Sequence, residues 1–431
     1  MKNNEESQLF VNQNSKKKNE TIKEHSDLKN YLLTKKGLYN LLLIIISIII
    51  FIVLLFIIKI QSFTPSSNEI KENQNNLLPS INQTLINELN EIMKSFEISL
   101  PLIVQNKQNI SLSKNPKISV VIPIYNNAEK IGLTVHSIQS QNLTDIEIII
   151  IDDNSEDDSV KIIEQFQQED SRIKLLKNKN NEGILYTRSI GVLNSKGKYI
   201  FPINSGDVFI NDIFNICYDE AELNFLDIVE FSGYNFSNLT TSPTPIQKFL
   251  NHKNDGKIIM QPKLFNFIYR EKKDRTGYDI IDEIIFGKCI KSSLYKSAIN
   301  LLNFFIFTEK LFFYESQVIN FGLFKNANSF KFINIKGIIH LHKKKTINDE
   351  NQFFHDKLKY AMSLYKITQN SKKVKIAIFE YESALNISSF EISEENKKLV
   401  SDAFNEIKKC KFISDDKKKD LEIKVKNIIS K

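Results

Sequence analysis

The pattern of apolar and polar positions divides the chain into a membrane-like segment, a polar connector and a globular region. From Leu41 to Ile58, the run LLLIIISIIIFIVLLFII is interrupted by only one polar residue, Ser47. At about 1.5 Å per residue, this run with its flanks approaches the roughly 30 Å thickness of a bilayer core. We therefore predict a transmembrane helix over residues 41–60, preceded by a polar tail over residues 1–40. A cleaved signal peptide is the alternative, but the leader is long and no small-residue cleavage site follows.

The charges around this segment predict its orientation. Lys59 and Lys71 are the nearest lysines after the apolar run, whereas a cluster precedes it: Lys16, Lys17, Lys18, Lys35 and Lys36. By the positive-inside rule the N-terminus lies in the cytosol. N-x-S/T sequons follow the span at Asn82, Asn109, Asn142, Asn235, Asn238 and Asn386. We expect a single-pass type II membrane protein of the Golgi or endoplasmic reticulum with a lumenal domain. Residues 61–116, rich in Asn, Gln, Ser and Pro, are predicted to form a stalk.

From Lys117 onward the pattern is that of an α/β domain. Continuous β-branched apolar runs at 118–124 and 146–152 predict buried strands, and residues 127–141 between them have helical spacing. A helix-like stretch at 160–168 leads to two further strands, 172–177 and 199–203. This alternation predicts a mostly parallel central sheet with helices on both faces. Later segments predict a strand over 225–235 and a lysine-rich helical C-terminal tail over 346–431.

Composition excludes some functions. The net charge of +7 comes from lysines spread along the chain with only four arginines, and no aromatic residues interleave with them as in a nucleic-acid surface. We therefore expect no nucleic-acid partner. Cys217, Cys289 and Cys410 are far apart and lack metal-binding spacing, so no zinc site is predicted, although one disulfide bridge is left open.

Candidate chemistry is expected where the parallel strands end. Ligands of such sheets bind beyond the carboxyl ends of the strands. Those ends carry Tyr125 and Asn126, then Asp152 and Asp153, then the turn after Ile203. No GxGxxG motif or P-loop follows the first strand, which excludes the usual dinucleotide-binding and ATPase sites.

Three motifs occur in order in this region. A P-x-Y-N pattern is matched by Pro123, Tyr125 and Asn126. A D-D-x-S pattern is matched by Asp152, Asp153 and Ser155, and an N-x-G-x-x-x-x-R-x-x-G pattern by Asn181, Gly183, Arg188 and Gly191. Over residues 117–345 the chain thereby resembles the family 2 glycosyltransferases of the A-type nucleotide-sugar-binding fold. The resemblance implies transfer of a sugar from a nucleotide-sugar donor to a glycan, protein or lipid acceptor.

The resemblance also assigns roles. It implies the following nucleotide-sugar-binding residues: Pro123, Tyr125, Asn126, Asp153, Arg188 and Asn204. Asp153 would accept a hydrogen bond from the base, while Ser155 capping the following helix with Asp158 is a structural alternative for this loop. Packing against the sheet edge is the alternative for Tyr125. The planar guanidinium of Arg188 suits a phosphate or ribose, and a surface helix arginine is its alternative.

Two departures from the family pattern affect the expected chemistry. The usual D-x-D-D turn reads Asn204, Ser205, Gly206, Asp207, which weakens the hold on a Mn²⁺ or Mg²⁺ cofactor. Asp207 is then the remaining candidate as metal ligand and catalytic group. His340 and His342 lie two apart in the segment GIIHLH, and we assign His342 as a second metal ligand, with a packed or exposed histidine as the alternative.

The second departure concerns the general base. The family's E-D pair is matched by Glu315 and Ser316, so the expected aspartate base is a serine. Glu315 is the substitute candidate, and a solvated helix acid is its alternative. Two functions therefore stay open: an active membrane-anchored glycosyltransferase, or a catalytically inactive relative that binds a nucleotide, a glycan or a partner subunit.

Overall fold

A computed structural model describes residues 113–236, 244–246, 255–271, 278–280, 284–311, 313–341, 350–386 and 391–430. The predicted N-terminal tail, transmembrane helix and most of the stalk lie outside these residues. Among the helices within the described ranges, none has the length and hydropathy needed to cross a bilayer. The predicted span at 41–60 therefore stays a prediction, as do the domain boundaries.

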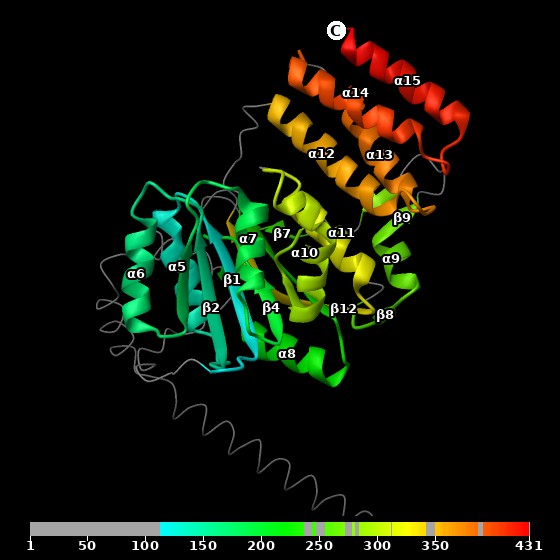
Figure 1. The fold of residues 1–431 in the computed structure, drawn as a ribbon. Coiled ribbons are helices and arrows are strands. Elements are labelled where there is room, and N and C mark those ends of the chain that lie inside the picture. Colours follow the sequence, from blue (N-terminus) through cyan, green and yellow to red (C-terminus); the bar gives the residue numbers. More distant parts are fainter. Residues whose placement is uncertain are drawn as a thin grey trace, which may run out of the picture. The chain divides into compact units, whose positions relative to one another are not determined.

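Four parallel strands form one half of the main sheet (Figure 1), and they are β1 (Ile118–Ile124), β2 (Ile146–Asp152), β3 (Ile173–Lys177) and β4 (Tyr199–Pro202). Their order is β3-β2-β1-β4. Every residue of β1 and β2 is buried. This explains why both strands are continuous apolar runs, as expected of a parallel sheet covered on both faces. The four predicted strands are confirmed.

The other half of the sheet is mixed. Continuing from β4, its order is β11 (Lys288–Lys291), β6 (Ile228–Phe236), β12 (Ser329–Leu341) and β5 (Val208–Phe209). Strand β11 is antiparallel to both β4 and β6, β12 is parallel to β6, and β5 is antiparallel to β12. Short strands β7 (Thr244–Pro245) and β8 (Ile258–Met260) extend this half, and β9 (Tyr269–Glu271) pairs separately with β10 (Tyr278–Ile280).

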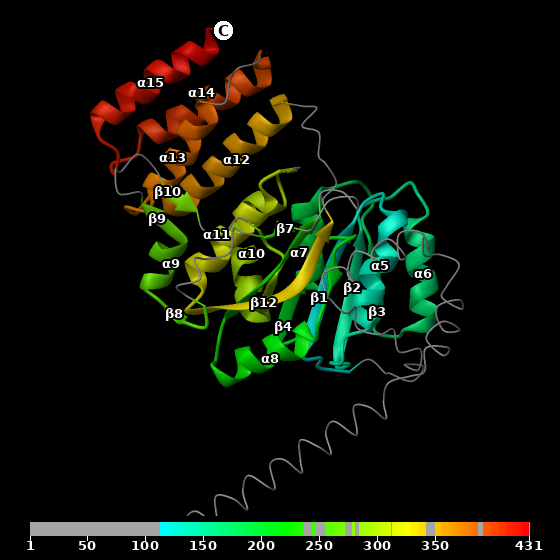
Figure 2. The same cartoon turned by 180° about the vertical axis from the view of Figure 1, so that it is seen from behind.

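Helices cover both faces of the parallel half (Figures 1 and 2). The chain steps from β1 through β2 to β3 in one direction and returns to β4 in the other. Right-handed crossovers therefore place α5 (Ala128–Gln139) and α6 (Ser159–Glu169) opposite α7 (Ile184–Leu193). Helix α7 packs tightly, because a side chain at Gly191 would overlap Ile151 of β2 and Val121 of β1. The predicted two-sided cover is confirmed.

Three further helices follow β5 in the chain: α8 (Ile213–Leu223), α9 (Lys263–Ile268) and α10 (Ser292–Ile306).

The capping alternative for the loop after β2 is wrong. Helix α6 begins at Ser159 with Asp158 as its N-cap residue, and no side chain caps it there. The Ser155 hydroxyl instead accepts a hydrogen bond from the backbone N–H of Asn126 at 3.0 Å.

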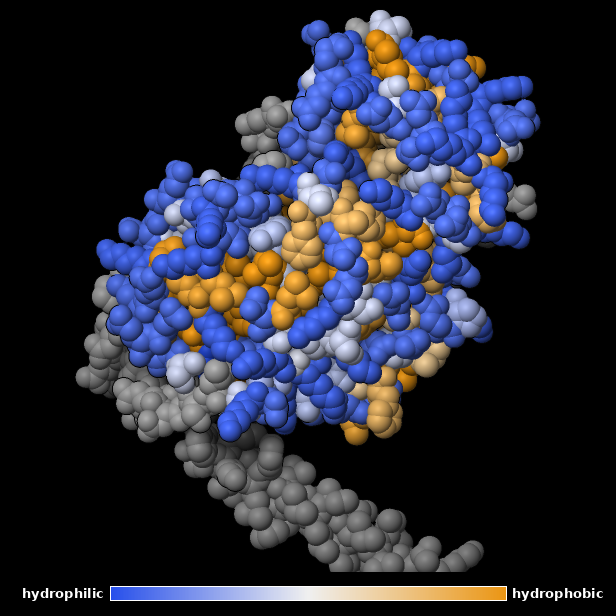
Figure 3. All heavy atoms as spheres, viewed as in Figure 1, coloured by the Kyte–Doolittle hydropathy of each residue, from blue (hydrophilic) through white to orange (hydrophobic). Residues whose placement is uncertain are grey.

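The C-terminal end is helical, as predicted, with α12 (Glu350–Thr368), α13 (Val374–Leu385), α14 (Glu394–Lys408) and α15 (Asp415–Ile429). Serine caps begin the last two helices, where Ser393 accepts from Asn396 N–H and Ser414 from Lys417 N–H, each at 3.3 Å. Helix α12 packs on α11 (Glu315–Asn326). The surface of this helical end is mostly hydrophilic in Figure 3, in keeping with its many lysines.

Candidate functional site

Three sequence-predicted residues gather at one edge of the sheet. Strands β1, β2 and β4 run parallel in adjacent positions, so Tyr125, Asp153 and Asn204 all follow the carboxyl ends of neighbouring strands. The Tyr125 side chain is 46% exposed, which contradicts its packed alternative. An exposed ring at this edge is available to stack on a flat ligand.

Pro123 and Asn126 support this edge from within. Pro123 is buried in β1 beside Ile151, so it shapes the strand end. Asn126 has a positive φ of 46°, and its side-chain carbonyl accepts a hydrogen bond from Glu156 N–H at 2.8 Å. Asn126 therefore holds the loops after β1 and β2 together. Their contact with a nucleotide stays a prediction.

Asp153 is buried and engaged on both carboxylate oxygens. Oδ1 accepts from the Asn178 side-chain amide and from Glu182 N–H, each at 2.8 Å. Oδ2 accepts from Gly183 N–H at 2.8 Å. The carboxylate thus fixes the turn that begins α7, and it retains lone-pair capacity for a further donor because a carboxylate offers about four acceptor sites. Its bond to a base stays a prediction.

Arg188 is the central polar contact of the site. Its side chain is 1% exposed, so the surface-arginine alternative is wrong. Nε donates to Glu315 Oε1 at 2.7 Å and Nη2 donates to Asn204 Oδ1 at 2.7 Å. Nη1 donates to the Ile203 carbonyl at 3.1 Å. One guanidinium therefore ties α7 to the turn after β4 and to the start of α11, using the fixed fork geometry of arginine.

Glu315 is not the solvated helix acid of the alternative. It is 6% exposed, and its second oxygen, Oε2, accepts a hydrogen bond from the Ser316 hydroxyl at 3.1 Å. Tyr295 of α10 lies within electrostatic reach of the Arg188–Glu315 pair, and burial raises the pKa of its phenol far above the usual range. The Tyr295 hydroxyl therefore stays neutral beside the ion pair.

The Asp207 side chain contacts strand β12. Its Oδ1 lies 2.7 Å from His340 Nδ1 and 3.3 Å from Leu341 N–H. The other oxygen, Oδ2, is buried and has no hydrogen-bond partner among the described residues. His342, the histidine we assigned to a metal, lies outside the described residues. Its assignment stays a prediction. His340, the other histidine of this segment, contacts Asp207 instead, and its ring stacks on Phe286 at a centroid distance of 4.5 Å.

The turn after β4 is held by residues that the sequence motifs did not single out. The Asn127 amide donates to the Ser205 carbonyl at 2.8 Å and to its hydroxyl at 3.0 Å. The Thr134 hydroxyl donates to the Asp207 carbonyl and accepts from Gly206 N–H, each at 2.8 Å. The position of Asn127 directly after P-x-Y-N was an available signal, but Thr134 in mid-helix offered none.

The described residues do not fit a divalent cation as they stand. They contain no group of three or more His, Cys, Asp or Glu side chains placed to hold a metal ion. Asn204 Oδ1 already faces the Arg188 cation and Asp207 Oδ1 already faces His340. Hard cations prefer several charged oxygens, and this turn presents none that is both unpaired and solvent-accessible.

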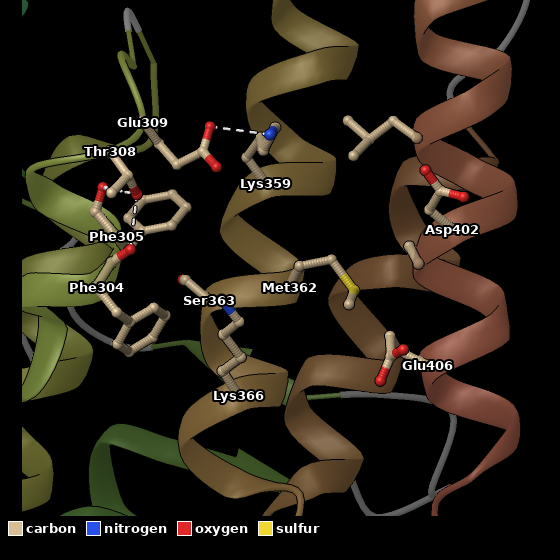
Figure 4. Close-up of a pocket in the computed structure, with 12 residues that line it drawn as sticks. Phe304, Phe305, Thr308, Glu309, Lys359, Met362, Ser363, Lys366, Asp402 and Glu406 are labelled. Carbon is tan, nitrogen blue, oxygen red and sulfur yellow. Dashed lines mark hydrogen bonds and ion pairs between the residues drawn. The ribbon is translucent and has the colours of Figure 1, made fainter.

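A separate pocket of about 210 Å³ lies between the end of α10 and helices α12 and α14. Figure 4 shows Glu309 and Lys359 facing each other across it, joined by an ion pair of 2.8 Å. The Lys366 ammonium lies 4.7 Å from the centre of the Phe304 ring. No predicted site residue lines this pocket, and its two lysines are already engaged by neighbours.

Comparison with known proteins identifies the domain. The family model described as Glycosyl transferase family 2 matches residues 119–297. Residues 119–297 thus form a glycosyltransferase family 2 domain. The matched range includes β1–β4 and their carboxyl-edge residues, so the family motifs lie on the elements that build the site. The solved structure of S. aureus TarS 1–349 in complex with UDP has the same fold, with a TM-score of 0.52 and 15% identity, covering 73% of this chain and 88% of that chain.

Two curated relatives of this glycosyltransferase domain come from bacteria. "Glycosyltransferase GlyG" of Streptococcus pneumoniae is 33% identical over 119 residues, 28% of this chain and 40% of the relative. "Uncharacterized glycosyltransferase EpsJ" of Bacillus subtilis is 26% identical over 266 residues, 62% of this chain and 70% of the relative. The GlyG match thus spans less than half of that relative's length.

Proposed function

We propose that this family 2 glycosyltransferase moves a sugar from a nucleoside-diphosphate donor to a hydroxyl group of a glycan, protein or lipid. The observation that carries the proposal is the convergence of Tyr125, Asp153 and Asn204 at the carboxyl edge of three adjacent parallel strands. Open α/β sheets bind their ligands at this place. The related TarS 1–349 structures include complexes with UDP and with UDP-GlcNAc, which supports a uridine donor.

In this proposal the base and the diphosphate of the donor contact different parts of the sheet edge. The base stacks on the exposed Tyr125 ring and hydrogen-bonds to Asp153, whose backbone donors leave acceptor capacity free. The diphosphate lies at the turn that begins with Asn204. Arg188 supports the site indirectly, because its guanidinium holds both Asn204 and Glu315 in place.

Glu315 is the proposed general base. Its Oε1 is held by Arg188, whereas Oε2 meets only the Ser316 hydroxyl in the described part of the chain. Oε2 is therefore the oxygen proposed to take the acceptor proton, and Ser316 moves aside or relays it. The longer glutamate arm replaces the aspartate that the family usually has at position 316.

The second candidate is a relative that binds a nucleotide without transferring a sugar. The specific observation in its favour is that Asn204, Gly206 and Ser316 stand at positions where acids are usual. Membrane anchoring through residues 41–60 and a lumenal Golgi or endoplasmic-reticulum location remain part of the proposal on sequence grounds alone. The bacterial relatives do not bear on that location.

A donor panel separates the two candidates. The purified full chain is incubated with UDP-GlcNAc, UDP-glucose, UDP-galactose or GDP-mannose, and released nucleoside diphosphate is measured with and without glycan acceptors. We expect release from at least one donor, and loss of release in Tyr125→Ala but not in Asp158→Ala, an exposed loop control. Binding without release in any combination favours the non-catalytic candidate, and absence of both contradicts the proposed function.

A further inference from the structure

The turn after β4 contains a glycine, Gly206, and the side chain of Lys130 lies next to it. Gly206 has φ of +102°, a conformation that L side chains rarely adopt. A Cβ atom built there would lie 3.4 Å from Lys130 Cβ and 3.5 Å from Lys130 Cδ. The aliphatic stem of Lys130 therefore lies over the position where the family resemblance predicts the second acid of the turn.

The remaining polar groups of the turn are already committed. Asn204 Oδ1 accepts from Arg188 at 2.7 Å, so this oxygen is already used. Asp207 Oδ1 is bonded to His340, while Oδ2 is buried away from solvent. A donor diphosphate carries two or more negative charges, so its departure requires positive charge from elsewhere in the site.

Lys130 is placed to supply that charge. It lies in the first turn of α5, directly after the β1 edge that carries Tyr125, and its side chain is half-buried. Within the described ranges its ammonium forms no ion pair, in contrast to Lys174 and Lys177 on β3, which pair with Glu147 and Glu164. The partial positive charge of the helix N-terminus adds to the same region.

We propose that the Lys130 ammonium replaces the divalent cation as the group that binds and stabilises the diphosphate of the donor. This inference rests on the proposed function. In the transfer step the acceptor oxygen bonds to the anomeric carbon while the bond from that carbon to the β-phosphate oxygen breaks. The electron pair stays on the diphosphate beside Lys130, and the acceptor proton passes to Glu315. No metal takes part in this step.

The test compares nucleotide binding with and without metal. Calorimetry on the full chain uses UDP, GDP and uridine as probes, in EDTA and in MnCl₂. We expect EDTA to change the diphosphate affinity by no more than about twofold. Lys130→Ala should weaken diphosphate binding by about ten- to a hundredfold, the size of one charge-assisted bond, and leave uridine binding unchanged.

Matched variants make the result specific. Lys130→Arg should keep most of the diphosphate affinity, and Lys161→Ala, an exposed lysine of α6, should keep all of it. Circular dichroism checks that each variant folds. Diphosphate binding that disappears in EDTA and returns with manganese would overturn this inference while leaving the proposed function standing, and so would unchanged affinity in Lys130→Ala. A wild-type chain that binds neither diphosphate nor uridine would overturn both.

Discussion

Removing the Arg188 side chain should destabilise the protein far more than removing a surface lysine. Arg188 and Glu315 form an ion pair of 2.7 Å with side-chain exposures of 1% and 7%. Breaking a buried pair by deleting one partner costs about 3–5 kcal/mol, because the other charge is left uncompensated. Arg188→Met also leaves the Ile203 carbonyl and Asn204 Oδ1 without a donor. We therefore expect a loss of unfolding free energy in the upper part of that range.

A double-mutant cycle isolates the pair. Glu315→Leu alone should also cost about 3–5 kcal/mol, whereas Arg188→Met with Glu315→Leu should cost less than the sum, by up to about 3 kcal/mol. The chain has no tryptophan, so urea unfolding is followed by far-UV circular dichroism. The matched control is Lys177→Met, which removes an ion pair with Glu164 that is about half exposed and should cost less than about 1 kcal/mol.

Two results would refute this reasoning. An Arg188→Met variant no less stable than Lys177→Met would show that the buried contacts do not hold the site together. Strict additivity in the cycle would show that Arg188 and Glu315 act independently, although their side chains are in contact in the structure.

Three further predictions concern pH, nucleotide and topology. Burial lowers the pKa of His136 from 6.5 to about 4. Between these pH values the unfolded chain binds a proton at His136 and the folded chain does not. The free energy of unfolding should therefore fall by about 3 kcal/mol as the pH drops through this window. His136→Leu should remove that slope in urea midpoints measured from pH 7 to 5, and an unaltered slope would contradict the assignment. Asp153→Ala should weaken UDP or GDP binding about ten- to a hundredfold by calorimetry, with Asp158→Ala as the unaffected control; equal affinities would leave Asp153 with only its turn-holding role. In sealed membrane vesicles, the region after Ile60 should resist protease until detergent is added, and digestion without detergent would refute the lumenal orientation.

The parallel half of the fold was predictable because its signals are local. Strands β1 and β2 are continuous β-branched runs, and the stretch between them has the helical spacing of α5. In the mixed half, the strand predicted over 225–235 is β6, which begins at Ile228. The strand order there was not predictable, because nothing local indicates that β11 enters the sheet between β4 and β6. Such order depends on long-range packing of short strands, for which sequence patterns carry little information.

The candidate site was likewise predictable only where its signals are local. Tyr125 and Asp153 were found from motifs because each directly follows a strand. The roles of Arg188 and Asp207 depend on partners 127 and 133 residues away, Glu315 and His340, and a single sequence does not reveal such pairs. Lys130 was hidden for a different reason. Its proposed role follows from the closeness of its side chain to Gly206, which only the three-dimensional turn discloses.

A crystal structure of the chain with UDP, grown in manganese and measured for anomalous scattering, would test the central claim most directly. The proposal predicts uridine between Tyr125 and Asp153, the diphosphate beside the Lys130 ammonium at the Gly206 turn, and no manganese peak at the phosphates. A manganese ion bridging the diphosphate to Asp207 and His340 would contradict it.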